Sequence, residues 1–317
     1  MLHVTKRRPP VVVVGQIARD LVLVVDDVPV PSGSAAVRER RELLGGKGAN
    51  IAVGLSQLGV PVAVVGVVGD DQVGEDLLAS CTQDGIDISA VARRPNAESA
   101  LMVDVVTADG HWRYLESVPS SALLTPSDVE PAAALLGKAS TVILQLQQPA
   151  GAILAALDHV RPGARVIMDG VPEDEQTRPQ LLAAATVLRL DAREAEILAD
   201  QAIPNESAAR TVAQNLLGRG PELVVIAVGT AGNLVAWYGD ATLLPLVGTA
   251  DVVDTTGSGD AFVAGLTWAL DRDEDPVRAG QLATAAAGLT VSHPGGRPSL
   301  SPARVDELAA ALAGGCA

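Results

Sequence analysis

The chain has 317 residues, 48% of them hydrophobic, and a formal net charge of -15 at pH 7. This length is enough for one large α/β domain, or for a domain with a small addition. The acidity excludes nucleic acid as the main partner, because binding a phosphate backbone requires a basic surface, but it leaves room for a small anionic ligand in a local site.

The cysteines, histidines and apolar stretches further narrow the class of protein to which the chain can belong. The only two cysteines are Cys81 and Cys316, which argues against a disulfide framework and fits the reducing cytoplasm. The four histidines show no metal-ligand spacing with the cysteines, so no zinc site is predicted. The apolar stretch 51–68 is interrupted by Gln57 and Pro61 and is no membrane span. We therefore expect a cytoplasmic protein that acts away from membranes.

Short runs of β-branched residues alternate along the chain with segments rich in Ala and Leu. Near-continuous apolar strands separated by helices are typical of a parallel sheet buried on both faces. The sequence therefore predicts an α/β layered fold. We expect strands at 11–14, 62–68, 142–146, 165–169, 187–190 and 223–228, and helices around 50–58, 74–84, 150–159, 193–200, 207–217, 261–270, 276–291 and 301–312.

Two segments interrupt the alternation. Residues 20–44 contain prolines, a charge cluster and strand-like pieces without a helix. Residues 99–117 resemble two strands around Asp109-Gly110, a strong hairpin signal, and they are rich in aromatic residues. The second segment could be an ordinary surface hairpin, or both segments could form a small β-sheet that covers the core as a lid. On the lid hypothesis, the core comprises residues 1–19, 45–97 and 118–317, and the lid comprises residues 20–44 and 98–117.

A first glycine cluster, residues 45–50 (GGKGAN), precedes an apolar helix. The P-loop pattern fails here because Arg41 and Gly48 stand at two of its required positions, and the spaced glycines of a dinucleotide-binding turn are missing after residues 11–14. A tight turn is the ordinary explanation for such a cluster. However, Lys47 and Asn50 fall within one turn over a glycine floor, which suits a ligand rich in hydroxyl groups. Asp20 can add an acceptor for a polyol.

A second cluster spans residues 254–266 (DTTGSGDAFVAGL) and leads into the expected helix 261–270. Gly257, Ser258 and Gly259 then lie at the helix N-terminus, where unpaired backbone N–H groups and the helix dipole favour an anion such as phosphate. The glycines allow the anion to approach closely. Asp260 could simply cap the helix, or it could accept a proton beside a transferring phosphoryl group. The segment alone leaves these two roles equally open.

Together, the two clusters supply the parts that a transferase needs to move phosphate onto a sugar hydroxyl. With both motifs present, the chain resembles the ribokinase or PfkB-type family of carbohydrate kinases. The first cluster resembles the family's N-terminal signature and the second its C-terminal signature, and the resemblance extends from about Val11 to about Leu312. It implies a three-layer parallel-sheet core flanked by helices, a small β-sheet lid over the sugar, ATP as phosphoryl donor, Mg²⁺, and a monovalent cation such as K⁺.

The resemblance also implies roles for individual residues. Asp260 would be the base that takes the proton from the sugar hydroxymethyl group, and the backbone amides of Gly257, Ser258 and Gly259 would form the anion hole. The positions that line the sugar site are Asp20, Gly45, Gly46, Lys47, Asn50 and Gln147. Those that handle Mg²⁺ and the nucleotide are Asp191, Glu194, Gly229, Thr230, Gly232 and Thr284. The positions of the cation site are Asp254, Thr256, Thr290, His293, Gly295 and Ser299, although a plain loop would also explain that segment. A solvated helix face would equally explain Glu194.

Departures from the family pattern affect the substrate more than the chemistry. Ala18 stands where ribokinases carry a sugar-facing Asn, and Gln147 stands where they carry Glu, so an anionic acceptor becomes a neutral amide. Asp191 replaces the usual Asn, and Thr284 replaces an Asn or His beside the adenine. The catalytic motifs are therefore complete, while the sugar and adenine contacts are altered.

Three hypotheses about function follow. The leading one is an ATP-dependent kinase acting on a primary hydroxyl of ribose or a similar sugar, with Asp260 as base. A second is a nucleoside kinase of the adenosine or pseudouridine type, in which Trp112 and Tyr114 could stack on the base, although these residues could equally pack within the lid sheet. A third is a sugar or nucleotide sensor that keeps the fold and has lost the chemistry, since a fold does not determine a function. We also expect a homodimer formed through the lid, because a small sheet has exposed edges.

Overall fold

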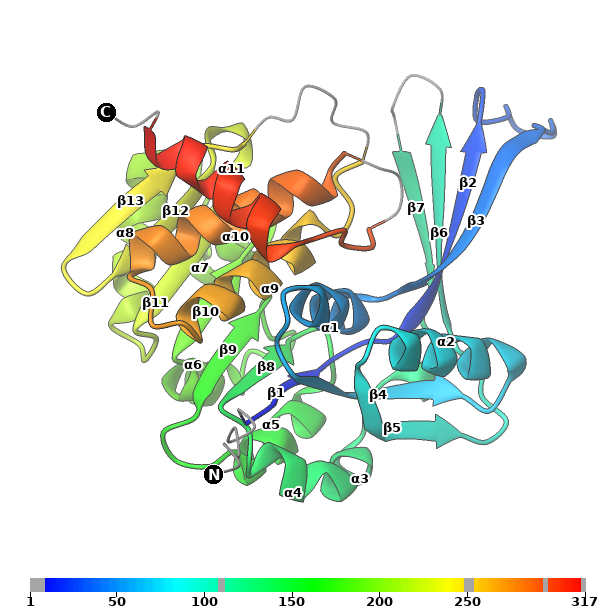
Figure 1. The fold of residues 1–317 in the computed structure, drawn as a ribbon, viewed down its shortest axis with the longest axis horizontal. Coiled ribbons are helices and arrows are strands. Elements are labelled where there is room, and N and C mark those ends of the chain that lie inside the picture. The colour runs from blue at the N-terminus through cyan, green and yellow to red at the C-terminus, as the bar shows by residue number, and fades with distance from the viewer. Residues whose placement is uncertain (1–8, 108–111, 248–253, 293–295, 315–317) are drawn as a thin grey trace, which may run out of the picture.

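A nine-stranded sheet forms the centre of the computed structural model, within the residues that it describes: 9–107, 112–247, 254–292 and 296–314 (Figure 1). Its order is β13-β12-β11-β10-β9-β8-β1-β4-β5. The strands from β11 to β5 are parallel, while β12 and β13 are added antiparallel at one edge. The strands are β1 (Val11–Val14), β4 (Val62–Gly69), β5 (Asp87–Arg94), β8 (Thr141–Gln145), β9 (Arg165–Asp169), β10 (Val187–Leu190), β11 (Leu223–Ala227), β12 (Asn233–Trp237) and β13 (Asp240–Leu244).

Helices cover both faces of this sheet, as the alternating pattern predicts. One face carries α1 (Lys47–Gln57), α2 (Gln72–Gln83), α9 (Ser258–Leu270), α10 (Pro276–Thr290) and α11 (Pro302–Gly314). The other carries α3 (Pro126–Val129), α4 (Ala133–Leu136), α5 (Ala150–His159), α6 (Arg178–Ala184), α7 (Ala192–Ala199) and α8 (Glu206–Leu217). No helix in the described part of the chain is long and apolar enough to cross a membrane.

Strand β1 illustrates why the central strands are entirely apolar. All four of its valines are fully buried, because successive side chains point to opposite faces and both faces are covered. Val11 and Val13 pack into the cluster beneath α1 and α9, and Val12 and Val14 into the cluster beneath α5 to α8. The three-layer α/β fold expected from the sequence is therefore confirmed.

A second, four-stranded sheet lies beside the first and has the order β3-β2-β6-β7 (Figure 1). We refer to it as the small sheet. Its strands are β2 (Ala18–Val25), β3 (Val37–Gly45), β6 (Ala100–Thr107) and β7 (Trp112–Ser117). The pairs β2–β3 and β6–β7 are antiparallel, whereas β2 and β6 are parallel. The two segments that interrupt the sequence pattern thus join in one sheet, and Asp109-Gly110 lies outside the described residues.

Three strands at or next to an edge of the large sheet were not predicted from the sequence. Strands β5 and β13 lie at the two edges of the large sheet, and β12 lies next to β13. The burial of β5 is mixed along its length, so it lacks the continuous apolar run of a central strand. Helix α1 also begins earlier than expected, at Lys47, so Lys47 and Asn50 belong to its first turn.

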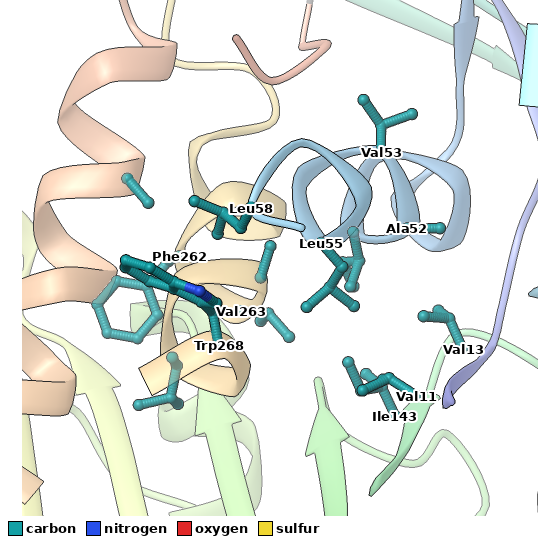
Figure 2. Packing of buried hydrophobic residues seen from close by; sticks show 14 of the residues in the cluster. Val11, Val13, Ala52, Val53, Leu55, Leu58, Ile143, Phe262, Val263 and Trp268 are labelled. Carbon is teal, nitrogen blue, oxygen red and sulfur yellow. The ribbon is translucent and has the colours of Figure 1, made fainter. Parts of the chain in front are cut away.

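The packing of α1 against α9 determines where the first turns of these two helices lie relative to each other (Figure 2). Side chains such as Leu55 of α1 and Val263 of α9 share one buried cluster above β1 and β8. The helices approach closely where Gly54 faces Ala264, since a Cβ atom at Gly54 would lie 2.8 Å from the Cβ of Ala264. This packing brings together the first turns of two helices that lie about two hundred residues apart in the sequence.

Candidate active site

A cavity of about 630 Å³ opens where the first turns of α1 and α9 meet the small sheet. Strands β8 and β10 also end at this cavity, which is the usual position of a ligand site in an open parallel sheet. The lining residues are Gln16, Gly46, Lys47, Asn50, Met102, Tyr114, Glu116, Val118, Leu123, Gln145, Gln147, Glu173, Arg189, Asp191, Thr255, Thr256, Gly257, Gly259 and Asp260.

Asp260 lies in the first turn of α9 and is 6% exposed. Asn50 Nδ2 donates a hydrogen bond to Asp260 Oδ2 at 3.0 Å, across 210 residues of sequence. Burial, reinforced by Asp169, raises the pKa of Asp260 to about 7, although Lys47, Asn50 and Arg189 act to lower it. A carboxyl group whose pKa lies near neutrality is well matched to accepting a proton at cellular pH.

The turn before α9 has the geometry of an anion site. Gly257 is the N-cap with φ of 70°, and a Cβ atom there would lie 1.8 Å from the carbonyl oxygen of Gly296, so only glycine fits. Gly257 and Gly259 both line the cavity. Ser258 behaves differently, because both its hydroxyl, at 2.7 Å, and its amide, at 3.3 Å, donate to the carbonyl of Thr255.

Buried acceptors without a donor lie near Asp260. Asp20 of β2 is 5% exposed, and its carboxyl group lies directly against Gly45, where a Cβ atom would be 1.9 Å away. Burial, with Asp260 next in importance, raises the pKa of Asp20 to about 7, while the Gly46 amide acts to lower it. Asp20 Oδ1 and Asn50 Oδ1 have no hydrogen-bond partner in the described part of the chain. Such orphan acceptors are costly unless a ligand supplies donors, as sugar hydroxyls would.

A polar network connects the start of α1 to the start of α7. Gln147 Nε2 donates to Glu194 Oε1 at 3.1 Å, and Lys47 Nζ lies 3.8 Å from the same oxygen. Asp191 and Glu194 form a capping box, in which each side chain accepts from the other's backbone amide. Glu194 is 8% exposed, so it does not lie on a solvated helix face. Burial acts to lower the pKa of Lys47, but Asp169, Asp260 and Glu194 outweigh it and raise that pKa.

Asp191 and Glu194 are the two carboxylates that could contribute to the predicted Mg²⁺ site. In the described residues, no group of three His, Cys, Asp or Glu side chains could hold a metal alone. The carboxylates of Asp191 and Glu194 already accept hydrogen bonds within their capping box. Mg²⁺ usually keeps several waters and binds substrate phosphates with one or two carboxylates, which is compatible with this arrangement.

The residues predicted to bind the nucleotide base lie outside the lining of the cavity. Gly229 and Thr230 form a short 3-10 turn (Gly229–Ala231) after β11, and Gly232 follows with φ of 129°. Thr284 is buried in α10, and its hydroxyl oxygen has no hydrogen-bond partner among the described residues. Helix α10 packs against β12, so the turn and the helix belong to the same end of the large sheet.

The structure describes four of the six residues predicted for the monovalent cation. Asp254 is buried and accepts a hydrogen bond from the Thr256 amide at 2.8 Å. The hydroxyl of Thr290, the last residue of α10, donates to the carbonyl of Ala286 at 3.1 Å. Ser299 is exposed. His293 and Gly295 lie outside the described residues.

Several cavity residues were missed by sequence reasoning. Gln145 Oε1 accepts from the Gln16 amide at 2.7 Å, which holds the turn after β1 against the end of β8. Arg189 of β10 forms an ion pair of 3.1 Å with the fully buried Asp169 at the end of β9. A charged residue within the otherwise apolar strand VLRL was the available signal for Arg189, because such a strand is normally apolar throughout.

Comparison with known proteins identifies the family. The family model described as "pfkB family carbohydrate kinase" matches residues 8–304 of the chain. The chain is similar to a ribokinase of Mus musculus, with 29% identity over 262 residues, covering 82% of this chain and 81% of the relative. It is also similar to an ATP-dependent ribose-1-phosphate kinase of Halopiger xanaduensis, with 30% identity over 304 residues, covering 94% and 96%. Its fold is similar to that of Arabidopsis thaliana ribokinase complexed with ribose and ATP, with a TM-score of 0.80, 23% identity, and 95% and 98% covered. The chain therefore belongs to the pfkB family of carbohydrate kinases.

Proposed function

We propose that this kinase transfers the γ-phosphoryl group of ATP to a primary hydroxyl of ribose or a similar sugar. The observation that carries the proposal is the bond between Asn50 and Asp260, which joins a hydroxyl-binding surface to the anion-binding start of α9 in one cavity. The relatives named ribokinase and ribose-1-phosphate kinase support the choice of a ribosyl acceptor.

In the proposed mechanism, the sugar hydroxyls donate to the orphan oxygens of Asp20 and Asn50. Asp260 takes the proton of the attacking sugar hydroxyl as the hydroxyl oxygen bonds to the γ-phosphorus. The bond from the γ-phosphorus to the bridging oxygen breaks, and ADP leaves with that electron pair. The amides of Gly257 and Gly259, with the ammonium group of Lys47, stabilise the charge on the phosphoryl oxygens. Positioning and charge stabilisation of this kind supply most of the rate in phosphoryl transfer.

We assign the nucleotide to the remaining predicted residues. The turn containing Gly229, Thr230 and Gly232, together with Thr284 of α10, would hold the nucleoside part of ATP. Asp191 and Glu194 would hold Mg²⁺ through water, and the ion would neutralise phosphate charge. A potassium ion near Asp254 and Thr256 is part of the same proposal, with Thr290, His293, Gly295 and Ser299 as the further predicted ligands.

The small sheet would act as the lid over the acceptor. Met102, Tyr114 and Glu116 project from it into the cavity, which supports this role. Burial raises the pKa of Tyr114 further above its usual value, as do Asp20 and Glu116, so its hydroxyl remains neutral. We also propose a homodimer formed through this sheet.

A substrate panel with ADP detection tests the proposed activity. We expect turnover with ribose or a related free sugar, measured with and without potassium. Asp260→Asn should reduce kcat by several orders of magnitude and preserve sugar binding measured by calorimetry, because only the base is lost.

The alternatives are distinguished by the same panel. Turnover of adenosine or pseudouridine with free sugars inert would establish the nucleoside kinase instead, with Tyr114 beside the base. Turnover of ribose 1-phosphate alone would show that the acceptor is a phosphorylated sugar. The carboxylates of Asp20 and Glu116 disfavour this outcome, because they would repel its phosphate. Sugar binding without any turnover would leave the sensor hypothesis.

A further inference from the structure

Arg189 is a charged residue in the middle of the buried large sheet. It is the third residue of β10, between β9 and β11, and its side chain is 13% exposed. Placing a guanidinium group there is costly unless it is paired and hydrogen-bonded. Because Arg189 lines the cavity while its strand neighbours Leu188 and Leu190 are fully buried, the charge is directed towards the site.

The guanidinium group lies against the first turn of α9. A Cβ atom at Gly259 would be 2.8 Å from Arg189 Nη2 and 3.2 Å from its Cζ. Glycine at position 259 therefore leaves room for the guanidinium beside the backbone amides that begin the helix. Two independent sources of positive potential, the helix N-terminus and Arg189, converge on one part of the cavity.

Asp169 fixes the orientation of Arg189. Arg189 Nη1 donates to Asp169 Oδ1 at 3.1 Å, and Asp169 is fully buried at the end of β9. Within the described residues this is the only side-chain hydrogen bond recorded for the guanidinium, which carries five N–H donors. The remaining donors form a planar fork that suits the oxygens of a phosphoryl group.

We propose that Arg189 is a catalytic clamp for the transferring phosphoryl group, anchored by Asp169; this inference rests on the proposed kinase function. The acceptor oxygen bonds to the γ-phosphorus, the bond to the bridging oxygen breaks, and its electron pair leaves on ADP. The hydroxyl proton passes to Asp260. Arg189 keeps its protons throughout and donates to the phosphoryl oxygens as their charge develops.

The experiment compares Arg189→Gln, Arg189→Lys and the double variant Asp169→Asn/Arg189→Gln. Arg189→Gln should lower kcat about 100- to 1,000-fold, as the loss of one transition-state donor does, with sugar affinity unchanged. Arg189→Lys should be intermediate, because a lysine supplies charge without the fork. The double variant removes both buried charges, which protects the fold, and it should remain as slow as Arg189→Gln.

A matched control comes from the opposite end of the strands, at the start of β9. Arg165 forms an ion pair of the same length, 3.1 Å, with Asp271, and it lines a different cavity. Arg165→Gln should therefore leave kcat unchanged. Recovery of the wild-type rate in the double variant would show that Arg189 merely neutralises Asp169, and it would overturn the proposal.

Binding of a transition-state mimic gives a readout that does not depend on turnover. With magnesium present, we expect Arg189→Gln to bind ADP with aluminium fluoride much more weakly than the wild type and to bind ADP alone equally well. Equal affinity of Arg189→Gln and the wild type for ADP with aluminium fluoride would overturn the clamp. This result can be obtained even if no sugar in the substrate panel is turned over. A kinase that is active on sugars and unaffected by Arg189→Gln would overturn the clamp and leave the proposed function standing.

Discussion

Individual side chains in and beside the cavity carry a dense set of charges of both signs. Lys47 and Arg189 face Asp169, Glu194 and Asp260. The three carboxylates act to raise the pKa of Lys47, and the two cations act to lower the pKa of Asp260. Burial favours the neutral form of Asp260 and raises its pKa, whereas the two cations favour its charged form. The result is a carboxyl group that titrates near pH 7 and can both accept a proton and return it to solvent.

The rate should follow the titration of Asp260. Its pKa is raised from 3.8 to about 7, so the fraction of charged base falls about tenfold for each unit of pH below 7. We expect kcat/KM to rise with pH up to about 7 and to level off above it. Asp20, also raised to about 7, titrates in the same range, so the profile reports the pair. A rate that stays flat from pH 5 to pH 8 would contradict this assignment.

The pH dependence of folding stability provides a second test of the raised pKa of Asp260. Because the folded protein holds the Asp260 proton more tightly than the unfolded chain, this group destabilises the fold as pH rises from about 4 to about 7. The Asp260→Asn variant lacks that titration. Its gain in Tm over the wild type should therefore grow across this range and remain constant above it.

At the scale of elements, the turn before α9 determines whether the helix N-terminus can receive an anion. Gly257 has a positive φ and touches the backbone of Gly296, so it also fixes how the segment after α10 lies against α9. The close approach of Gly54 to Ala264 likewise fixes how α1 lies against α9. Small residues at these points are required by packing as well as by the ligand.

Gly257→Ala should therefore abolish turnover and lower Tm, because the added methyl group would overlap the carbonyl of Gly296. Gly163→Ala is the matched control, since Gly163 has a similar φ of 80° and nothing within 4 Å of its added Cβ. The control should lose only the conformational cost of about 1 kcal/mol and retain kcat. Equal losses of activity in the two variants would refute a specific role for the turn, and activity assays with thermal melts distinguish the outcomes.

At the scale of the whole molecule, the small sheet has two different faces. Tyr114 of β7 lines the cavity, while its neighbour Leu115 points away and is 62% exposed. Val37 at the start of β3 and Val30 before it are exposed as well. A second copy of the sheet is the partner that we propose for these exposed apolar residues.

Sedimentation should therefore show a species of twice 32.3 kDa at micromolar concentration. Leu115→Glu should shift it to the monomer, because a carboxylate cannot be buried there without a partner. Tyr238→Glu, which changes an exposed aromatic residue at the other edge of the molecule, should leave the dimer intact. A monomeric wild type would refute the prediction.

The sequence by itself determined the family, the α/β layers and the two glycine motifs, because apolar periodicity and glycine positions are local properties of the chain. It also indicated Asp260, but only as one of two equal alternatives until the motif at residues 45–50 was considered. It missed β5, β12 and β13. Of these, β5 and β13 are edge strands of mixed burial that lack the continuous apolar run of central strands.

Only the tertiary structure decided which side chains meet. The hydrogen bond between Asn50 and Asp260 depends on how α1 packs on α9, and the contact of Arg189 with Gly259 depends on the strand order of the sheet. The burial of Glu194, which excludes a solvated helix face, likewise follows from neighbours distant in sequence. Distances, burial and pKa values arise from such long-range contacts, and a sequence pattern read segment by segment contains none of them.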